Sequence, residues 1–282
     1  MLKTAFIGSE NHYDKRLCEW ISEHSDLSLI IWTNNLSWAT STTGNRKKRI
    51  LDRFLKRARK NGIVRTVDEF LYYVLFRATL MDEEERKVKA AIDGVPVAPR
   101  RPLSDIPQVR PYDIKSPELV ELMKSHGIEA VFSMCIDVYL PKQLINTPKH
   151  GAFLWHEGYT PEYRGVYPAF WALVNEDYDL LGYTLLRMNS KLDAGEIFLQ
   201  GRARNLDLTK DWHSYIAHKS IVDSLPEVQE FLVALEQGTA KPIERPNAKD
   251  GYYSYPTASA LLKLMWRRFW NKPRVQQHIN AQ

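Results

Sequence analysis

The sequence predicts an α/β fold in which an open, mostly parallel twisted sheet carries helices on both faces. Two apolar runs, Thr4–Gly8 (TAFIG) and Leu27–Trp32 (LSLIIW), have the length and composition of buried strands. Between them, the segment from about Asp14 to His24 has apolar residues at helical spacing. A strand, a helix and a strand within about thirty residues indicate a right-handed βαβ unit and hence a parallel sheet, so a Rossmann-like arrangement is expected.

Length and composition agree with this class. A chain of 282 residues with 44% hydrophobic and 26% charged residues can bury a sizeable core, which excludes general disorder. The two cysteines, Cys18 and Cys135, have no zinc-type spacing and predict neither a disulfide framework nor a metal site. The apolar start is too short for a secretion signal, and no run of eighteen apolar residues exists. We therefore expect a cytoplasmic protein without a membrane span.

The segment from Arg46 to Lys89 predicts a helical insertion. Lys47–Lys60 has an apolar stripe at helical spacing, and Thr66-x-x-Glu69 predicts a capping box for a second helix. We expect the insertion to cover the sheet, form a dimer surface or flank a substrate. Ten of the twenty residues from 46 to 65 are Lys or Arg, so contact with an anionic partner or a membrane surface stays open. The apolar face expected to pack on the core consists of Val67, Phe70, Leu71, Val74, Leu75 and Ala78.

The remaining elements follow from the same signals. We expect a domain over residues 1–205 and an extension over residues 206–282 that packs on it. In order, the elements are an irregular Gly94–Pro111, a helix from Ser116-Pro117 to Gly127, strand Ala130–Cys135, a short helix Pro141–Asn146, strand Gly151–Trp155, helix Pro168–Asn175, the strand pair Gly182–Met188 and Glu196–Arg202, a helical Asp211–Gly238 broken at Pro226, a Pro- and Tyr-rich tail from Lys241, and a basic aromatic helix Ala258–Trp270.

Residues that can carry chemistry gather between His156 and Asp193. His156 follows a predicted strand, and ligands of open α/β sheets sit at the carboxyl ends of strands. The loop after it contains Gly158 and Gly165, which permit close approach of the backbone to a ligand. Asp193 lies in a turn between two predicted strands. A histidine and an aspartate brought together there form a proton shuttle with an orienting carboxylate.

The segment from Gly151 to Phe198 resembles the catalytic core of the folate-dependent formyltransferase family, in order and in spacing. That family includes methionyl-tRNA, glycinamide ribonucleotide and sugar N-formyltransferases. The residues that carry the resemblance are Leu154-Trp155-His156, Pro161, Tyr163-Arg164-Gly165, Pro168, Trp171-Ala172, Gly182-Tyr183-Thr184, Met188 and Leu192-Asp193-Ala194-Gly195.

The resemblance implies a role for each group. His156 would transfer the proton, and Asp193 would tune it and hold a water. The formyl donor would be N10-formyltetrahydrofolate, and the acceptor the primary amine of a small molecule, for which we expect an amino sugar or a sugar nucleotide. The cofactor-binding residues would be Cys135, Ile136, Asp137, Val138, Tyr139, Leu140, Met188 and Leu192.

Two departures from the family pattern affect the chemistry. Leu154 stands where the family has the Asn whose amide stabilises the oxyanion, and loss of one such donor costs about a hundred- to a thousandfold in rate. Asn189, the Trp155 indole nitrogen and Tyr159 are candidate replacements. Glu157 adds a carboxylate beside His156, as a catalytic assistant or a partner for the acceptor's ammonium. We expect substrate contacts from Tyr159, Tyr163, Arg164 and Tyr167.

Other functions stay open beside this one. The same scaffold could carry a folate-independent hydrolase or lyase that uses His156, Glu157 and Asp193, or a degenerate binding module. A nucleic-acid role is not expected, because a net charge of +5 is a weak field. His213 and His218 are expected to be packing or surface residues. The run Tyr252–Pro256 predicts a strand on the core, with stacking on a sugar as the alternative.

Overall fold

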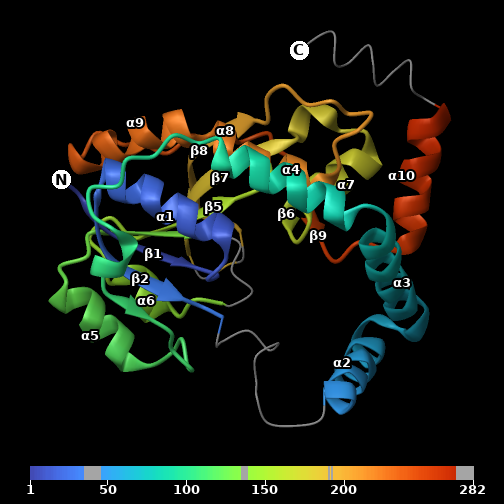
Figure 1. The fold of residues 1–282 in the computed structure, drawn as a ribbon, viewed down its shortest axis with the longest axis horizontal. Coiled ribbons are helices and arrows are strands. Elements are labelled where there is room, and N and C mark those ends of the chain that lie inside the picture. The colour runs from blue at the N-terminus through green and yellow to red at the C-terminus, as the bar shows by residue number, and fades with distance from the viewer. Residues whose placement is uncertain (35–45, 135–138, 190, 192, 271–282) are drawn as a thin grey trace.

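The computed structural model describes residues 1–34, 46–134, 139–189, 191 and 193–270, and the expected α/β fold is confirmed (Figure 1). Seven strands form one sheet in the order β3-β2-β1-β4-β5-β7-β8. The first five strands in that order run parallel, and β7 and β8 join antiparallel at one edge. The strands are β1 (Lys3–Gly8), β2 (Asp26–Trp32), β3 (Gln108–Val109), β4 (Ala130–Met134), β5 (Ala152–His156), β7 (Gly182–Arg187) and β8 (Glu196–Arg202).

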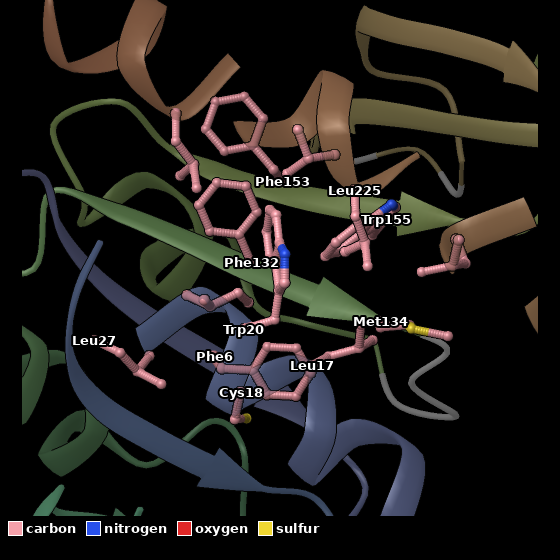
Figure 2. Close-up of a cluster of buried hydrophobic side chains, with 14 of the residues drawn as sticks. Phe6, Leu17, Cys18, Trp20, Leu27, Phe132, Met134, Phe153, Trp155 and Leu225 are labelled. Carbon is pink, nitrogen blue, oxygen red and sulfur yellow. The ribbon is translucent and has the colours of Figure 1, made fainter. Parts of the chain in front are cut away.

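Helices cover both faces of this sheet. On one face, α1 (His12–His24) and α9 (Leu225–Glu236) close the largest hydrophobic cluster, in which Trp20 packs near Trp155 (Figure 2). On the other face, α5 (Pro117–Ser125) and α6 (Lys142–Asn146) cover a second cluster. The strands β1, β2, β4, β5 and β7 are buried on both sides, which explains why they appear in the sequence as largely continuous apolar runs.

The insertion consists of three helices, where the sequence analysis expected two. They are α2 (Arg46–Asn61), α3 (Ile63–Thr79) and α4 (Met81–Asp93). The expected capping box is wrong. Gly62, at a φ of +86°, lets α3 begin at once, and Thr66 donates its hydroxyl proton to the Gly62 carbonyl one turn inside the helix. Glu69 is buried and forms ion pairs with Arg57 and Arg65.

The orientation expected for α3 is also wrong. Its buried face consists of Thr66, Glu69 and Tyr72, and most of the apolar side chains expected in the core are exposed. The reason is that the inner face packs through the aromatic rings of Tyr72 and Phe76 and is held by polar contacts, including a 2.8 Å hydrogen bond between the Tyr72 hydroxyl and His213. The apolar face is therefore left pointing outward.

The rest of the chain follows the expected elements closely. Helix α7 (Pro168–Asn175) has the predicted bounds, and α8 (His213–Asp223) and α9 are separated at Ser224, just before Pro226. The segment expected to be irregular, Gly94–Pro111, contains a short 3-10 turn, Leu103–Asp105, and the two-residue strand β3. A second 3-10 turn, Tyr178–Leu180, lies between α7 and β7. A further hydrophobic cluster joins α7, α8, α10 (Ala258–Trp270) and α3.

A second, two-stranded sheet joins the C-terminal extension to the loop after β5. Strand β6 (Arg164–Gly165) pairs in parallel with β9 (Tyr252–Tyr253), as the strand prediction for the tyrosine run anticipated. Tyr253 stacks on Tyr163 with ring centroids 4.9 Å apart. Among the described residues, no helix is long and apolar enough to cross a membrane.

Candidate active site

His156 is the last residue of β5, at the carboxyl end of the parallel strands. Side chains alternate along a strand, so Leu154 and His156 point to the face opposite Trp155. Trp155 is fully buried and donates its indole N–H to Ser224 at 2.8 Å. Leu154 is half-buried, whereas most of its strand neighbours are buried. The site therefore lies on the α5–α6 side of the sheet, at its carboxyl edge.

The loop after His156 is held by two polar side chains from the antiparallel strands. The Thr184 hydroxyl donates to the Gly158 carbonyl at 2.7 Å and accepts from the Thr160 amide at 3.0 Å. Gln200 donates to the Thr160 carbonyl at 2.6 Å and to the Thr184 hydroxyl at 3.1 Å. Both anchors come from elements that pair directly or through one strand with β5, so the loop is fixed relative to the histidine.

The imidazole of His156 is buried and contacts this loop. Its Nε2 lies 3.1 Å from the Tyr163 carbonyl. A carbonyl oxygen only accepts hydrogen bonds, so Nε2 carries a proton, and in the neutral ring Nδ1 is the nitrogen that holds the lone pair. Gly158 allows this packing, because a Cβ atom there would lie 2.6 Å from Nε2 and 2.6 Å from Pro168. The side-chain position of His156 is thus set from two sides.

Asp193 is joined to the same backbone segment. Its carboxylate accepts from the Gly165 amide at 2.9 Å, two residues beyond the carbonyl that His156 contacts. Asp193 is buried and has a φ of +47°, in the left-handed region that non-glycine residues rarely adopt. Such conformations cluster at functional sites. The structure thus brings both predicted catalytic residues to residues 163–165, from opposite ends.

A buried carboxylate that the sequence analysis did not single out lies near Glu157. Asp14, at the start of α1, accepts a 2.7 Å hydrogen bond from the Ser9 amide. Burial, with a smaller contribution from the charge of Glu157, raises the pKa of Asp14 to about 7 against the lowering effect of its hydrogen bonds. Glu157 is thus close enough for its charge to act on the start of α1. The sequence signal for Asp14 was only its place at the expected start of the first helix.

The predicted substrate-binding residues line one continuous stretch. Tyr159 lies under the guanidinium of Arg245, 5.2 Å from its ring centroid. Arg164 forms an ion pair with Asp250 at 2.6 Å, while its buried Nε has no hydrogen-bond partner. Tyr163 is buried and donates its hydroxyl proton to Asp177, so what it offers at the site is its carbonyl.

Tyr167 closes this stretch at the start of α7. It adopts a left-handed conformation with a φ of +57° and is partly exposed. Its ring lies 6.3 Å from that of Tyr72 on α3 and 6.0 Å from that of Tyr255. The helical insertion and the C-terminal extension therefore both reach the edge of the site.

Part of the predicted folate-binding segment can be placed. Leu140 belongs to the hydrophobic cluster on the site face, and Met188 packs against that cluster. Tyr139 is exposed. The buried Ser133 hydroxyl, which pairs in register with Leu154, has no hydrogen-bond partner among the described residues. An apolar bed beside an unpaired hydroxyl fits a flat heterocycle that forms hydrogen bonds. Cys135, Ile136, Asp137, Val138 and Leu192 lie outside the described residues.

Of the candidate replacements for the missing amide, the Trp155 indole is wrong, because it points into the core on the other face. Asn189 is exposed and donates its amide to the Ala194 carbonyl at 2.5 Å, so it braces the turn that holds Asp193. Tyr159 stays a prediction. His213 is buried and hydrogen-bonded to Tyr72, and burial lowers its pKa to about 3, which is the packing role expected for it.

Sequence reasoning missed the residues that hold the loop. Thr184 and Gln200 resemble ordinary polar positions on strands, and Arg245 lies in a segment without a recognisable pattern. Arg245 contacts Gln200 and pairs with Glu162, so it ties the C-terminal extension to the loop. In the part of the chain that the structure describes, no group of three or more His, Cys, Asp or Glu residues is placed to hold a metal ion.

The fold and the site together define a Rossmann-like α/β protein with a buried histidine and a buried aspartate held to one backbone segment at the carboxyl edge of its sheet. Residues 78–214, which contain this site, match the family described as formyl transferase. Over that segment, a little under half of its length, the chain is similar to the formyl transferase family.

Individual relatives agree with this family. A methionyl-tRNA formyltransferase of Thermodesulfovibrio yellowstonii is 25% identical over 149 residues, which are 51% of this chain and 48% of that protein. A phosphoribosylglycinamide formyltransferase from Anaplasma phagocytophilum superposes with a TM-score of 0.53 at 13% identity, over 90% of this chain and 99% of that one. A sugar N-formyltransferase from a Shewanella species gives 0.52 at 13% identity, over 94% and 87%. The structural likenesses show the fold, and the chain spans about half the length or less of the curated relatives it matches.

Proposed function

We propose that this protein is an N-formyltransferase that moves a formyl group from N10-formyltetrahydrofolate to the primary amine of a small acceptor in the cytoplasm. The observation that carries the proposal is the joint anchoring of His156 and Asp193 on residues 163–165, within the segment that matches the formyl transferase family. Each element of that arrangement has a role in amine formylation.

His156 is the proposed proton acceptor for the attacking amine. With Nε2 donating to the Tyr163 carbonyl, the lone pair on Nδ1 takes the proton. Burial excludes water from one side of the ring, and the hydrogen bond to the Tyr163 carbonyl fixes its tautomer. Asp193 stabilises the charge that develops when the imidazole is protonated, through the segment both residues share and through a water held by its carboxylate. Glu157 adds negative charge that attracts the acceptor's ammonium, and Asp14 adds to it in its ionised form.

The folate supplies the formyl group that is transferred. Leu140 and Met188 would hold its pterin against the apolar cluster, with Ser133 beside it. The segment 135–140 and the loop 188–193 would contribute backbone groups, as expected from the family resemblance. Tyr159, Arg164 and Tyr167 would contact the acceptor on the other side of His156.

The amino-sugar acceptor is the finer part of the proposal. The named relatives include a sugar N-formyltransferase, alongside enzymes that act on methionyl-tRNA and phosphoribosylglycinamide. The aromatic residues near the site support a sugar acceptor, since aromatic faces stack on sugar rings. They are Tyr159, Tyr167 and Tyr255. Arg164, with one unpaired N–H, would suit the phosphate of a sugar nucleotide.

Calorimetric titration with 5-formyltetrahydrofolate, a stable stand-in for the donor, tests the first half of the proposal. We expect binding at micromolar concentration for the wild type and for His156→Gln, because the histidine acts on the amine. Formyl transfer to a panel of amino sugars and their nucleotides tests the second half. His156→Gln and Asp193→Asn should each lose transfer, and wild-type rates in either variant would refute the site.

Leu154 provides an independent test of the reaction. If formyl transfer is the reaction, Leu154→Asn restores an amide on the site face and should raise the rate, by up to about a hundred- to a thousandfold. Leu154→Gln offers the same chemistry on a longer arm and serves as the control for position. A Leu154→Asn protein that binds folate but gains no rate would contradict the assigned oxyanion position.

A folate-independent hydrolase is the second candidate. It is favoured by Leu154, which offers no donor, and by the carboxylate of Glu157, which follows His156 directly and acts on the nearby Asp14. The discriminating result is simple: a protein that fails to bind folate at millimolar concentration, yet hydrolyses N-acylated sugars in a His156-dependent manner, is this hydrolase.

A further inference from the structure

Helix α3 shows an apolar stripe to solvent. Ile63, Val67, Phe70 and Val74 recur every three or four residues, and all four are exposed, Ile63 by 68% and Phe70 by 54%. The opposite side of the helix is the side that packs on the protein. An amphipathic helix of a globular protein ordinarily turns such a stripe to the core, so the outward stripe requires another explanation.

Helix α10 repeats this arrangement. Its buried side consists of Ala258, Leu261 and Leu264. Its outward side carries apolar residues at helical spacing, and Trp266 and Phe269 are 66% and 68% exposed. The outward apolar side chains of α10 are Leu262, Met265, Trp266, Phe269 and Trp270.

The two stripes adjoin each other. Asp68 of α3 accepts a 3.0 Å hydrogen bond from the Ser259 amide of α10. Residues three or four apart share a helix face, so Asp68 lies beside Leu71, and Ser259 lies beside Leu262. The contact between the helices therefore runs along the border of both stripes. Figure 1 shows α2, α3 and α10 together at the end of the molecule away from β1 and β2.

Positive charge surrounds this apolar surface. In sequence, helix α2 contains nine Lys or Arg and one acidic residue. Helix α10 has no acidic residue and adds Lys263, whereas its Arg267 and Arg268 face the protein and donate to the Val174 and Asp211 carbonyls. Lys56, Lys60 and Lys263 are exposed. The whole chain nets only +5, so the rest of the protein is net negative and the excess cation is concentrated at this end.

We propose that the surface formed by α2, α3 and α10 docks on a membrane containing anionic phospholipids. Tryptophan and phenylalanine are the side chains that settle at the headgroup level, and lysine and arginine beside them bind lipid phosphates. A second copy of the chain is the weaker occupant, because face-to-face docking would bring two strongly cationic helices together. The proposal is independent of the reaction at His156.

Co-sedimentation of the purified protein with phosphatidylcholine vesicles, with and without phosphatidylglycerol, tests this surface. We expect binding to the vesicles that contain phosphatidylglycerol, weakened by added salt. Trp266→Ala/Phe269→Ala should weaken it about tenfold or more through lost insertion, and Lys56→Glu/Lys60→Glu by a similar factor through lost attraction. All four side chains are exposed or lie on an outward face, so the fold should persist.

Matched substitutions elsewhere test whether vesicle binding depends on this surface or on exposed charges and aromatic rings in general. Tyr112→Ala removes an aromatic ring that is 89% exposed, and Lys115→Glu/Lys149→Glu reverses two exposed charges outside α2, α3 and α10. These variants should bind vesicles like the wild type. Wild-type protein that binds vesicles with phosphatidylglycerol no better than vesicles without it would overturn the proposal. So would a dimer in analytical ultracentrifugation that Trp266→Ala/Phe269→Ala makes monomeric, since that would identify a second copy as the occupant.

Discussion

Thr184→Val tests how the loop that carries the site is held. The change keeps the size and branching of the side chain and removes only the hydroxyl, which is completely buried. That hydroxyl contacts the Gly158 carbonyl, the Thr160 amide and the Gln200 amide. Valine leaves these three groups without this partner in a place that water does not reach.

The magnitude follows from those contacts. A buried polar group left unsatisfied costs about 1–3 kcal/mol. Gln200 retains its bond to the Thr160 carbonyl, so two groups, the Gly158 carbonyl and the Thr160 amide, bear most of the loss. We expect the free energy of unfolding to fall by about 2–6 kcal/mol. Because Gly158 touches His156 on one side, catalysis should fall more than stability alone predicts at temperatures where the variant is folded.

Urea unfolding followed by circular dichroism gives the free energy, and formyl transfer at low temperature gives the rate. Thr184→Ser is the matched control, since it retains the hydroxyl and loses one methyl group. It should be less destabilised than Thr184→Val and keep most of its activity. If valine and serine are equally stable, or if valine loses less than about 0.5 kcal/mol, the hydroxyl does not hold the loop and the reasoning is refuted.

Three further predictions concern other contacts. Asp14→Asn should flatten the pH dependence of stability. The native pKa of Asp14 is raised to about 7, so its protonation stabilises the folded state, and this stabilisation is complete below the unfolded pKa of about 4. It is lost as the pH rises through 7, by up to about 1 kcal/mol per pH unit. Melting curves from pH 5 to 8 check it, and parallel curves for both proteins would contradict it. Gly165→Ala should detach β9 and abolish activity, because its Cβ would lie 2.1 Å from the Tyr253 carbonyl oxygen at a φ of +97°; limited proteolysis near residue 252 reports the detachment, and an intact, active variant would refute it. Tyr72→Phe should cost about 1–3 kcal/mol by leaving His213 Nε2 without its 2.8 Å partner, and an unchanged urea midpoint would exclude that role.

The sequence predicted those elements whose residues interact with near neighbours or with a uniform core. The strands of the sheet are apolar on both faces, so their runs are visible without a partner, and Pro168 marks the start of α7 by itself. In contrast, β3 consists of two residues and exists only by pairing with Ile30 and Ile31, which lie far earlier in the chain. Such a strand has no local signal.

The candidate site shows the same division. His156 and Asp193 could be selected because their local motifs stand in a recognisable order. The loop anchors Thr184 and Gln200 contact residues 24 to 40 positions away, and nothing in their own neighbourhood marks them. The apolar stripe of α3 could be predicted from the sequence, but whether it faces the core or solvent could not. Periodicity shows which residues share a helix face and not what that face contacts.

The pairing of β6 with β9 has a consequence for how the protein matures during its synthesis. The partner of Arg164 is Tyr252, about ninety residues later, and Arg245 also reaches back to the loop. At a translation rate of about 5–20 residues per second, the loop waits roughly 5–20 seconds on the ribosome before its partner strand emerges. The sheet can form in that interval, yet the loop that bears the carbonyl facing His156 has no strand beside it. The nascent chain therefore acquires its fold first and its site later, and the interval between them is set by the length of α8, α9 and the tail that follows.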